Sequence, residues 1–230
     1  MTDAPPPGAP APAPAPRWPE GWALPVIASP ATTAPTHRAL LARLDAAPPA
    51  APRFFGADAF ETFQAACARL VPSTGLAEPV DVAWAIDARL ADGGSDGWRY
   101  ATLPPDGEAF QAGVAALDAA AAAAHAERFC DLSGAQQDAL LADAQHARGP
   151  FAAALPAGFD AANWFADWLA EASGLFYGHP LVQESIGYAG FADAGPGSPG
   201  GPADDPAGAP GWTRIGLDER EDREPDPLTP

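Results

Sequence analysis

Histidine side chains bind metals and transfer protons near neutral pH, so the four histidines of this chain are the first candidates for chemistry. A zinc or iron site would place two ligands three or four positions apart on one helix face. No two of the histidines have that spacing; they are His37, His125, His146 and His179. We therefore expect no metal site in this chain.

His179 has the most informative position of the four. It lies between Gly178 and Pro180, where a long aromatic helix is expected to end. A protonated ring there would interact favourably with the last helical carbonyls, which is a structural role. The competing interpretation is a self-contained helical enzyme that uses His179 with Glu184 for proton transfer. Because no spacing in the chain forms a convincing catalytic set, we favour the structural role and expect no catalytic residue.

The cysteines and one acidic loop are the other candidate sites. Cys67 and Cys130 form no Cys-x-x-Cys motif, so we expect buried free thiols, with a disulfide between them as the alternative. The loop 92–97 has the acids and glycines of a calcium loop but lacks its full spacing with a terminal glutamate, so we expect a turn. No Gly-x-Gly-x-x-Gly motif follows a predicted strand, so no dinucleotide site is expected.

The elements that would hold these residues are all helical. The 29 prolines and 23 glycines gather at the two ends and leave the middle of the chain able to pack a core. Apolar residues recur at helical spacing through that middle part. The sequence predicts an all-α fold with one helical-bundle domain over residues 35–190, a disordered Pro/Ala-rich arm over 1–34, and an irregular Gly/Pro-rich and acidic tail over 191–230.

Periodicity and end signals predict the individual helices. Ser133-x-x-Gln136 has the pattern of a capping box, and Asp160 is a candidate N-cap. Gly149 and Pro150 are expected to end a helix. The predicted helices cover residues 36–44, 58–71, 80–90, 106–125, 133–148 and 160–176, with an Ala/Pro/Gly linker over 151–158.

The segment 164–188 is the densest apolar and aromatic part of the chain. Its first half, 164–176, has the spacing of a core helix, whereas its second half leaves regular structure at Tyr177-Gly-His-Pro and Ile186-Gly-Tyr. An aromatic segment of this length needs a surface to pack against. We therefore expect a partner interface here, formed by Trp164, Trp168, Tyr177, His179, Pro180, Tyr188 and Trp212.

Two tryptophans interrupt the Pro/Ala arm. Trp18 and Trp22 are too apolar to be left in water, so this piece is expected to dock on the domain or on a partner. We favour a weak clasp on the domain itself. Ala-Pro repeats over residues 9–16 keep the preceding part extended and solvated.

The charge balance excludes some partners. The chain has 30 acidic and 12 basic residues, and its net charge is −18. Binding to nucleic acid or to an anionic membrane surface needs clustered cations, so neither is expected. No run of about 18 apolar residues, no signal peptide and no twin-arginine motif is present. By its own signals the chain is expected in the cytoplasm, without membrane insertion.

Several segments together resemble the small subunit of a family of flavin-dependent sugar and polyol dehydrogenases, the gluconate 2-dehydrogenase subunit 3 (gamma) family. The resemblance covers roughly residues 54–216. Each piece is loose, and their order and spacing make the pattern specific. The matching pieces are Phe54-Phe55 to Pro72 with Cys-Ala-Arg-Leu-Val-Pro, residues 80–90, Asp131-Leu-Ser-Gly-Ala-Gln-Gln-Asp-Ala-Leu-Leu141, residues 164–188 with Phe-Tyr-Gly-His-Pro and Ile-Gly-Tyr, and Gly211-Trp212.

The resemblance implies an all-helical accessory subunit without a cofactor of its own. Its partner would be a large FAD-containing subunit of the glucose-methanol-choline oxidoreductase type, which passes electrons to a cytochrome c subunit or a quinone. The small subunit would assist folding, flavin loading or export. Relatives often carry a twin-arginine export signal, whereas this chain has a Pro/Ala arm in that place. Both cytoplasmic assembly and a periplasmic or membrane-associated location by co-export with the partner are therefore open.

A second function class remains in view. A free-standing helical binding or carrier protein would have no dehydrogenase partner, and its aromatic residues would line an internal pocket. Such a chain would be monodisperse and stable alone. The accessory subunit is instead expected to be colourless and inactive alone and to co-purify with a flavoprotein.

Overall fold

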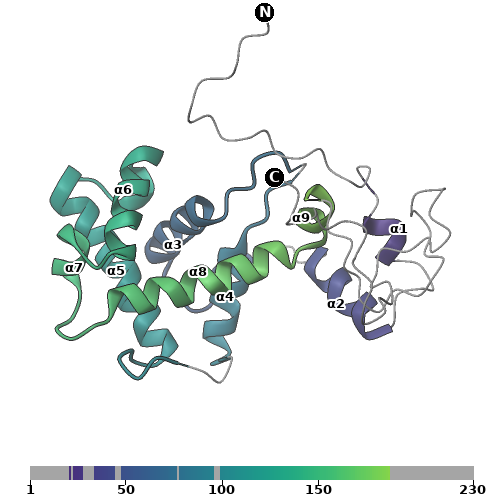
Figure 1. Ribbon diagram of the computed structural model, residues 1–230, viewed down its shortest axis with the longest axis horizontal. Coiled ribbons are helices and arrows are strands. Elements are labelled where there is room, and N and C mark those ends of the chain that lie inside the picture. The colour runs from purple at the N-terminus through teal and green to yellow at the C-terminus, as the bar shows by residue number, and fades with distance from the viewer. Residues whose placement is uncertain are drawn as a thin grey trace, which may run out of the picture. The chain divides into compact units, whose positions relative to one another are not determined.

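The computed structural model describes residues 21, 23–27, 34–44, 48–76, 78–95 and 99–186, without the side chains of residues 25 and 26. Every regular element in these ranges is helical and none is a strand, so the predicted all-α fold is confirmed. No helix in the same ranges is both long and apolar enough to cross a membrane. The elements in Figure 1 are α1 (Ala23–Ile27), α2 (Ala34–Leu44), α3 (Ala57–Leu70), α4 (Val82–Ala91), α5 (Asp106–His125), the 3-10 turn η1 (Phe129–Asp131), α6 (Gly134–Gln145), α7 (Gly149–Ala154), α8 (Ala161–Tyr177) and α9 (Pro180–Ser185).

The chain divides into two compact units. One unit is the continuous segment Asp45–Val182, which contains α3 to α8 and is called the helical unit below. The other unit combines Met1–Leu44 with Gln183–Pro230. The predicted domain of residues 35–190 has different limits, because α2 and the end of α9 belong to the second unit.

The six predicted helices occur as α2, α3, α4, α5, α6 and α8, with ends that differ by a few residues. The capping box before α6 is present, and the backbone N–H of Ser133 donates to Gln136 Oε1 at 3.0 Å. The N-cap of α8 is also as predicted, because Asp160 Oδ1 accepts the N–H of Asn163 at 3.1 Å. These local signals therefore place two helix starts correctly.

The linker predicted over residues 151–158 is wrong in its first half, where α7 forms. Positive φ angles of 49° at Ala147 and 62° at Gly149 turn the backbone after α6. Pro150 then stands in the first turn of α7, where its fixed φ favours a helix and its missing N–H costs nothing. Phe151 is fully buried and fixes the new helix to the core. The Gly-Pro pair thus ends one helix and begins the next.

The core of the helical unit is arranged around α8. This long helix contacts α3, α4, α5 and α6, while α7 packs along α5. At Gly113 of α5 the indole of Trp164 comes so close that an added Cβ atom would lie 2.1 Å from its Cζ2. Ala120 and Ala121 of α5 are fully buried. Small side chains on α5 therefore allow its neighbours to approach closely.

A buried carboxylate attaches the segment before α3 to α4. Asp87 is 1% exposed and accepts backbone N–H groups of three successive residues. The donors are Arg53 at 2.6 Å, Phe54 at 3.1 Å and Phe55 at 3.0 Å. Because backbone donors lost from water are costly to leave unpaired, this contact fixes the entry into α3.

In the second unit, another carboxylate holds α1. Glu184, 8% exposed, accepts the N–H of Gly21 at 2.8 Å and of Ala23 at 2.7 Å. Ala23 and Ile27 are buried. A clasp of the N-terminal region therefore exists at residues 21–27; Trp18 and Trp22 lie outside the described residues.

Candidate functional site

The aromatic residues at the start of α8 are core residues. Trp164 is 1% exposed and stacks on Phe151 with ring centroids 5.8 Å apart. Trp168 is fully buried and stacks on Phe63 at 5.6 Å. A buried indole offers no surface to a second chain, so Trp164 and Trp168 do not belong to the proposed interface. Helical spacing alone does not distinguish apolar residues that face the core from apolar residues that face a partner. For this reason the sequence prediction placed both tryptophans in the interface.

The end of α8 has the opposite character. Tyr177 is 54% exposed and Leu175 is 37% exposed. The helix then closes at Gly178, whose N–H donates to Gly174 O at 3.0 Å. Exposed aromatic and aliphatic side chains on one helix end are typical of protein interfaces. Leu175 and Tyr177 are two positions apart, so they point to different sides of the helix end; together we call them the α8 end surface.

The remaining residues of the expected interface fall into three classes. Pro180 is buried, so it is a packing residue of α9. His179 is partly buried, and its Nδ1 accepts the Leu181 N–H at 3.3 Å, so the ring serves the first turn of α9. Tyr188 and Trp212 lie outside the described residues.

Each carboxylate oxygen of Glu184 accepts one backbone N–H, from Gly21 and from Ala23, so this side chain has a structural role. The pairing of His179 with Glu184 in a helical enzyme stays a prediction.

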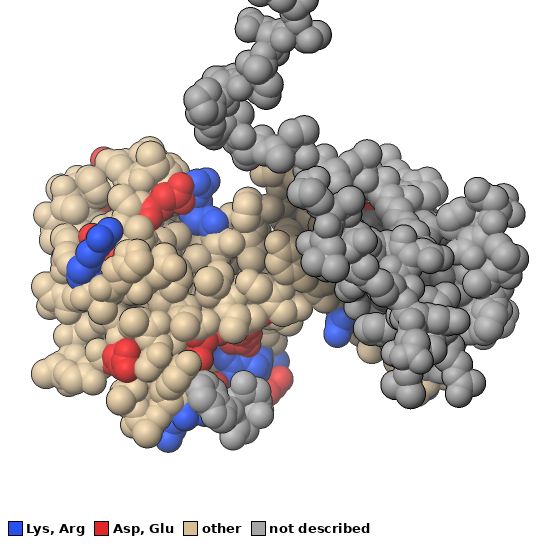
Figure 2. All heavy atoms as spheres, viewed as in Figure 1, with Lys and Arg blue, Asp and Glu red and all other residues tan. Residues whose placement is uncertain are grey.

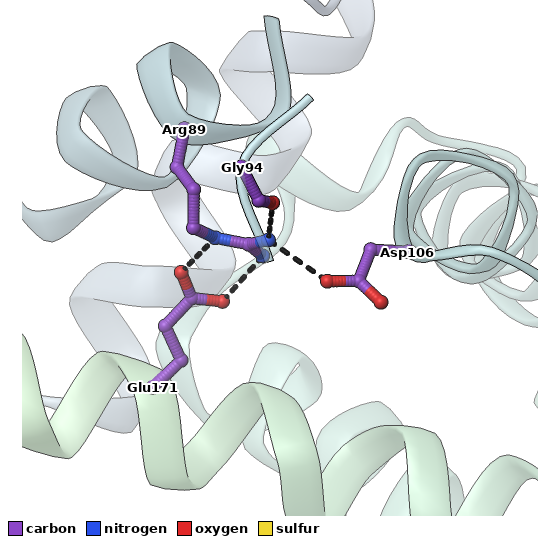
Figure 3. A network of polar contacts seen from close by, with 4 residues as sticks. All are labelled: Arg89, Gly94, Asp106 and Glu171. Atoms are coloured by element: carbon purple, nitrogen blue, oxygen red, sulfur yellow. Dashed lines mark hydrogen bonds and ion pairs between the residues drawn. The ribbon is translucent and has the colours of Figure 1, made fainter. Parts of the chain in front are cut away.

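Arg89 is the centre of the main polar network, which Figure 3 shows. Its Nε and Nη2 donate to the two oxygens of Glu171 on α8 at 2.5 and 2.8 Å. Its Nη1 donates to Gly94 O at 2.7 Å and to Asp106 Oδ2 at 2.8 Å. Burial lowers the pKa of Arg89, but the two carboxylates outweigh that effect and raise it. One guanidinium thus joins α4, the loop after it, α5 and α8.

Arginines of the helical unit are generally paired in this way. Figure 2 shows red and blue side chains next to one another on the visible face, with broad tan areas between them. Among the described residues of this unit, Arg99 alone has no ion pair. The pairs are Arg53–Asp92, Arg69–Asp138, Arg89–Asp106, Arg89–Glu171, Arg128–Glu61 and Arg148–Asp143.

Both cysteines are free thiols. Burial raises the pKa of Cys67 well above its ordinary value, and the adjacent indole of Trp168, which makes no hydrogen bond of normal geometry, offsets little of that rise. Burial also raises the pKa of Cys130, with Arg128 acting in the opposite direction. The expected buried free thiol is found at Cys67, whereas Cys130 is free but only partly buried. Neither cysteine has the lowered pKa of a nucleophile.

The acidic loop after α4 is built as a turn in its described part. Gly93 has a φ of 66°, Gly94 N–H donates to Arg89 O at 2.9 Å, and Asp92 is paired with Arg53. Residues 96–98 lie outside the described ranges. Across those ranges, no three His, Cys, Asp or Glu side chains are grouped as a metal site.

The prediction that no serine of this chain lies in a Gly-x-Ser-x-Gly motif is wrong, because this loop contains one. Gly93-Gly-Ser95-Asp-Gly97 matches Gly-x-Ser-x-Gly, the pattern of a hydrolase nucleophile. That chemistry requires the serine on a sharp turn between a strand and a helix. Ser95 instead follows helix α4, so the match carries no nucleophile elbow.

The sequence of the chain matches one known protein family. The gluconate 2-dehydrogenase subunit 3 pattern matches residues 57–195, more than half of the chain. The chain belongs to this family. Its matched region begins with α3 and extends beyond α9, so it includes the whole of α8 and the α8 end surface. No curated protein and no solved structure matches the chain.

Proposed function

We propose that this member of the subunit 3 family is the noncatalytic small subunit of a flavin-dependent gluconate, sugar or polyol dehydrogenase. The family match over residues 57–195 is the observation that carries the proposal. The family's name describes a dehydrogenase subunit. The small subunit would aid folding, flavin loading or assembly of the catalytic subunit.

The proposed partner is a large FAD-containing subunit of the glucose-methanol-choline type, with a cytochrome c subunit as a further member. FAD would be held by the large subunit, and this chain would hold no cofactor. Assembly in the cytoplasm, or in the periplasm after co-export, fits this proposal equally.

The α8 end surface is the proposed contact with that partner. Tyr177 and Leu175 are large apolar side chains in water, and burying them on association would stabilise the complex. Tyrosine is also enriched among the residues that dominate binding energy. His179, partly buried in the next turn, would lie at the edge of the contact.

Co-purification tests the proposed assembly. A tagged chain is recovered from native lysate, scanned across the flavin absorbance bands and assayed for gluconate-dependent dye reduction. We expect the recovered complex to be yellow and active and the chain purified alone to be colourless and inactive. Flavin bound to the chain alone, or dehydrogenase activity without a partner, would contradict the proposal.

A substitution tests the surface. Tyr177→Ala should weaken association with the flavoprotein by about tenfold or more while helix content stays unchanged, because the side chain is more than half exposed. Leu24→Ala is the matched control, since Leu24 is 52% exposed and lies on α1. Loss of helix content with unchanged association would assign Tyr177 to the core instead.

One observation favours the alternative of a free-standing binding protein. A cavity of about 450 Å³ is lined by Phe110 and Trp164. A carrier would be monodisperse and stable without any flavoprotein, so size-exclusion chromatography of the native protein separates the two functions.

A further inference from the structure

Glu184 holds α1 through two hydrogen bonds between segments that are far apart in the sequence. Its two carboxylate oxygens accept the N–H groups of Gly21 and Ala23, which lie 163 and 161 positions earlier. All three residues belong to the second unit. Glu184 is 8% exposed, so the contact is largely shielded from water. A carboxylate at this place stabilises the start of α1 as a capping side chain does, although it comes from a distant segment.

α1 is short and depends on this contact. It has five residues, and helices of fewer than about 12 residues are marginal in water without tertiary contacts. Among its described side chains, Ala23 and Ile27 are buried, whereas Leu24 is 52% exposed. An element with so few contacts can open locally while the rest of the protein stays folded. We therefore expect α1 to open far more readily than the helical unit unfolds.

α1 covers a segment that belongs to the expected partner surface. The family pattern spans residues 57–195, so it includes Glu184 but not α1. In the sequence, Glu184 lies between Tyr177 of the α8 end surface and Ile186, which are 54% and 53% exposed. Large apolar side chains in water are typical of surfaces that become buried on association. In the free chain, α1 thus occupies the middle of a segment whose two ends are exposed and apolar.

We propose that α1 is an autoinhibitory strap, which occupies Glu184 in the free chain and leaves it when the flavoprotein binds. The inference rests on the proposed function, because the displacing partner is the large dehydrogenase subunit. That partner must supply hydrogen-bond donors to Glu184 in place of the two N–H groups, since a buried carboxylate without donors is costly.

The strap lowers the affinity for the flavoprotein. Only chains with an open strap can bind, so the measured affinity is the intrinsic affinity multiplied by the open fraction. A strap that is open in about one chain in ten lowers the affinity about tenfold. Release of the strap should recover that factor.

Hydrogen exchange of the unmodified full chain tests the strap without any substitution. Exchange is followed by mass spectrometry for the chain alone and for its complex with the co-purified flavoprotein. We expect residues 23–27 to exchange about tenfold faster in the complex, because α1 has left Glu184. Binding usually slows exchange, so this direction is diagnostic. Equal or slower exchange of α1 in the complex would overturn the proposal.

A pair of substitutions in α1 tests the effect on affinity. Ile27→Asp places a charge at a fully buried position and should release the strap, so the full chain should bind the flavoprotein about tenfold more tightly. Leu24→Asp is the matched control at the exposed position of the same helix and should leave the affinity unchanged. Unchanged or weaker binding by Ile27→Asp, with normal exchange in α3 and α5, would refute the strap. Should exchange in those helices rise, the measurement on the unmodified chain decides.

The strap and the proposed function fail separately. A chain that recovers no flavoprotein contradicts the proposed function and the strap together. A complex in which α1 stays protected leaves the dehydrogenase assembly intact and contradicts the strap alone.

Discussion

Gly113 is the residue at which the core tolerates no side chain. A Cβ atom added there would lie 2.1 Å from Trp164 Cζ2, closer than two non-bonded carbon atoms can approach. A side chain there forces α5 and α8 apart or displaces a fully packed indole. The sequence alone did not single out this glycine, because the contact depends on which helix crosses α5 and at which height.

Gly113→Ala should therefore lower the free energy of unfolding by about 1–3 kcal/mol through overpacking. Gly174→Ala is the matched control, since Gly174 is also helical and a Cβ atom added to it would meet no other atom within 4 Å. That change should be neutral or stabilising by up to about 1 kcal/mol. Chemical denaturation of both variants measures the difference, and equal stability of the two would contradict the close approach.

Asp87 is a buried polar residue at which a substitution should also destabilise the fold. Asp87→Asn keeps the shape but leaves one acceptor oxygen and adds an amide donor facing three backbone N–H groups. We expect a loss of about 2–3 kcal/mol of stability, because buried donors lose their partner. Asp138→Asn, at an exposed ion pair with Arg69, should cost at most about 1 kcal/mol. Similar denaturation midpoints for the two variants would show that Asp87 is not an anchor.

At the scale of elements, the start of α8 depends on the ionisation of Asp160. Hydrogen bonds from the Asn163 backbone, and then from Thr102, lower the pKa of Asp160 below its ordinary value. A carboxyl with a lowered pKa stabilises the fold fully above its unfolded pKa, and the contribution disappears as the pH falls through the folded value.

Asp160→Ala should accordingly cost about 1 kcal/mol of stability at neutral pH through loss of the N-cap. The difference from the unmodified chain should shrink as the pH falls below about 4, where the carboxyl of the unfolded chain becomes protonated, and should disappear as the pH falls through the lowered pKa of the folded state. Thermal melts between pH 7 and pH 3 measure this, with Asp131→Ala, an exposed acid of η1, as the control. A difference that is constant over this range would exclude the carboxylate as the cap.

The helix starts that the sequence predicted correctly depend on capping residues close to them in the chain. Ser133, Gln136 and Asp160 act within three residues, so their caps were predictable. The helix at Phe151 was missed because Gly149-Pro150 signals both an end and a start, and tertiary burial of the phenylalanine decides between them. Residues such as Asp87 and Arg89 join elements distant in sequence, and no local pattern reports such contacts.

At the scale of the whole molecule, the division into two units departs from the single predicted domain. Composition marked the Pro/Gly-rich ends but could not show that α1, α2 and the end of α9 group together. Composition also could not identify the interface residues. Trp164 and Tyr177 are both large aromatic residues of α8, but Trp164 is 1% exposed and Tyr177 is 54% exposed. Burial follows from packing, which residue types alone do not specify.

The hydrogen bonds of Glu184 with Gly21 and Ala23 are expected to stabilise α1 without affecting the helical unit. Glu184→Ala removes the acceptor of two backbone N–H groups, so α1 should open locally while the helical unit keeps its stability. Hydrogen exchange followed by mass spectrometry should show faster exchange over residues 23–27 and unchanged exchange in α3 and α5. Glu127→Ala, at an exposed residue after α5, is the control and should alter neither region. Faster exchange throughout the helical unit of the Glu184 variant would mean that the two units unfold together, because loss of one clasp contact would then destabilise both.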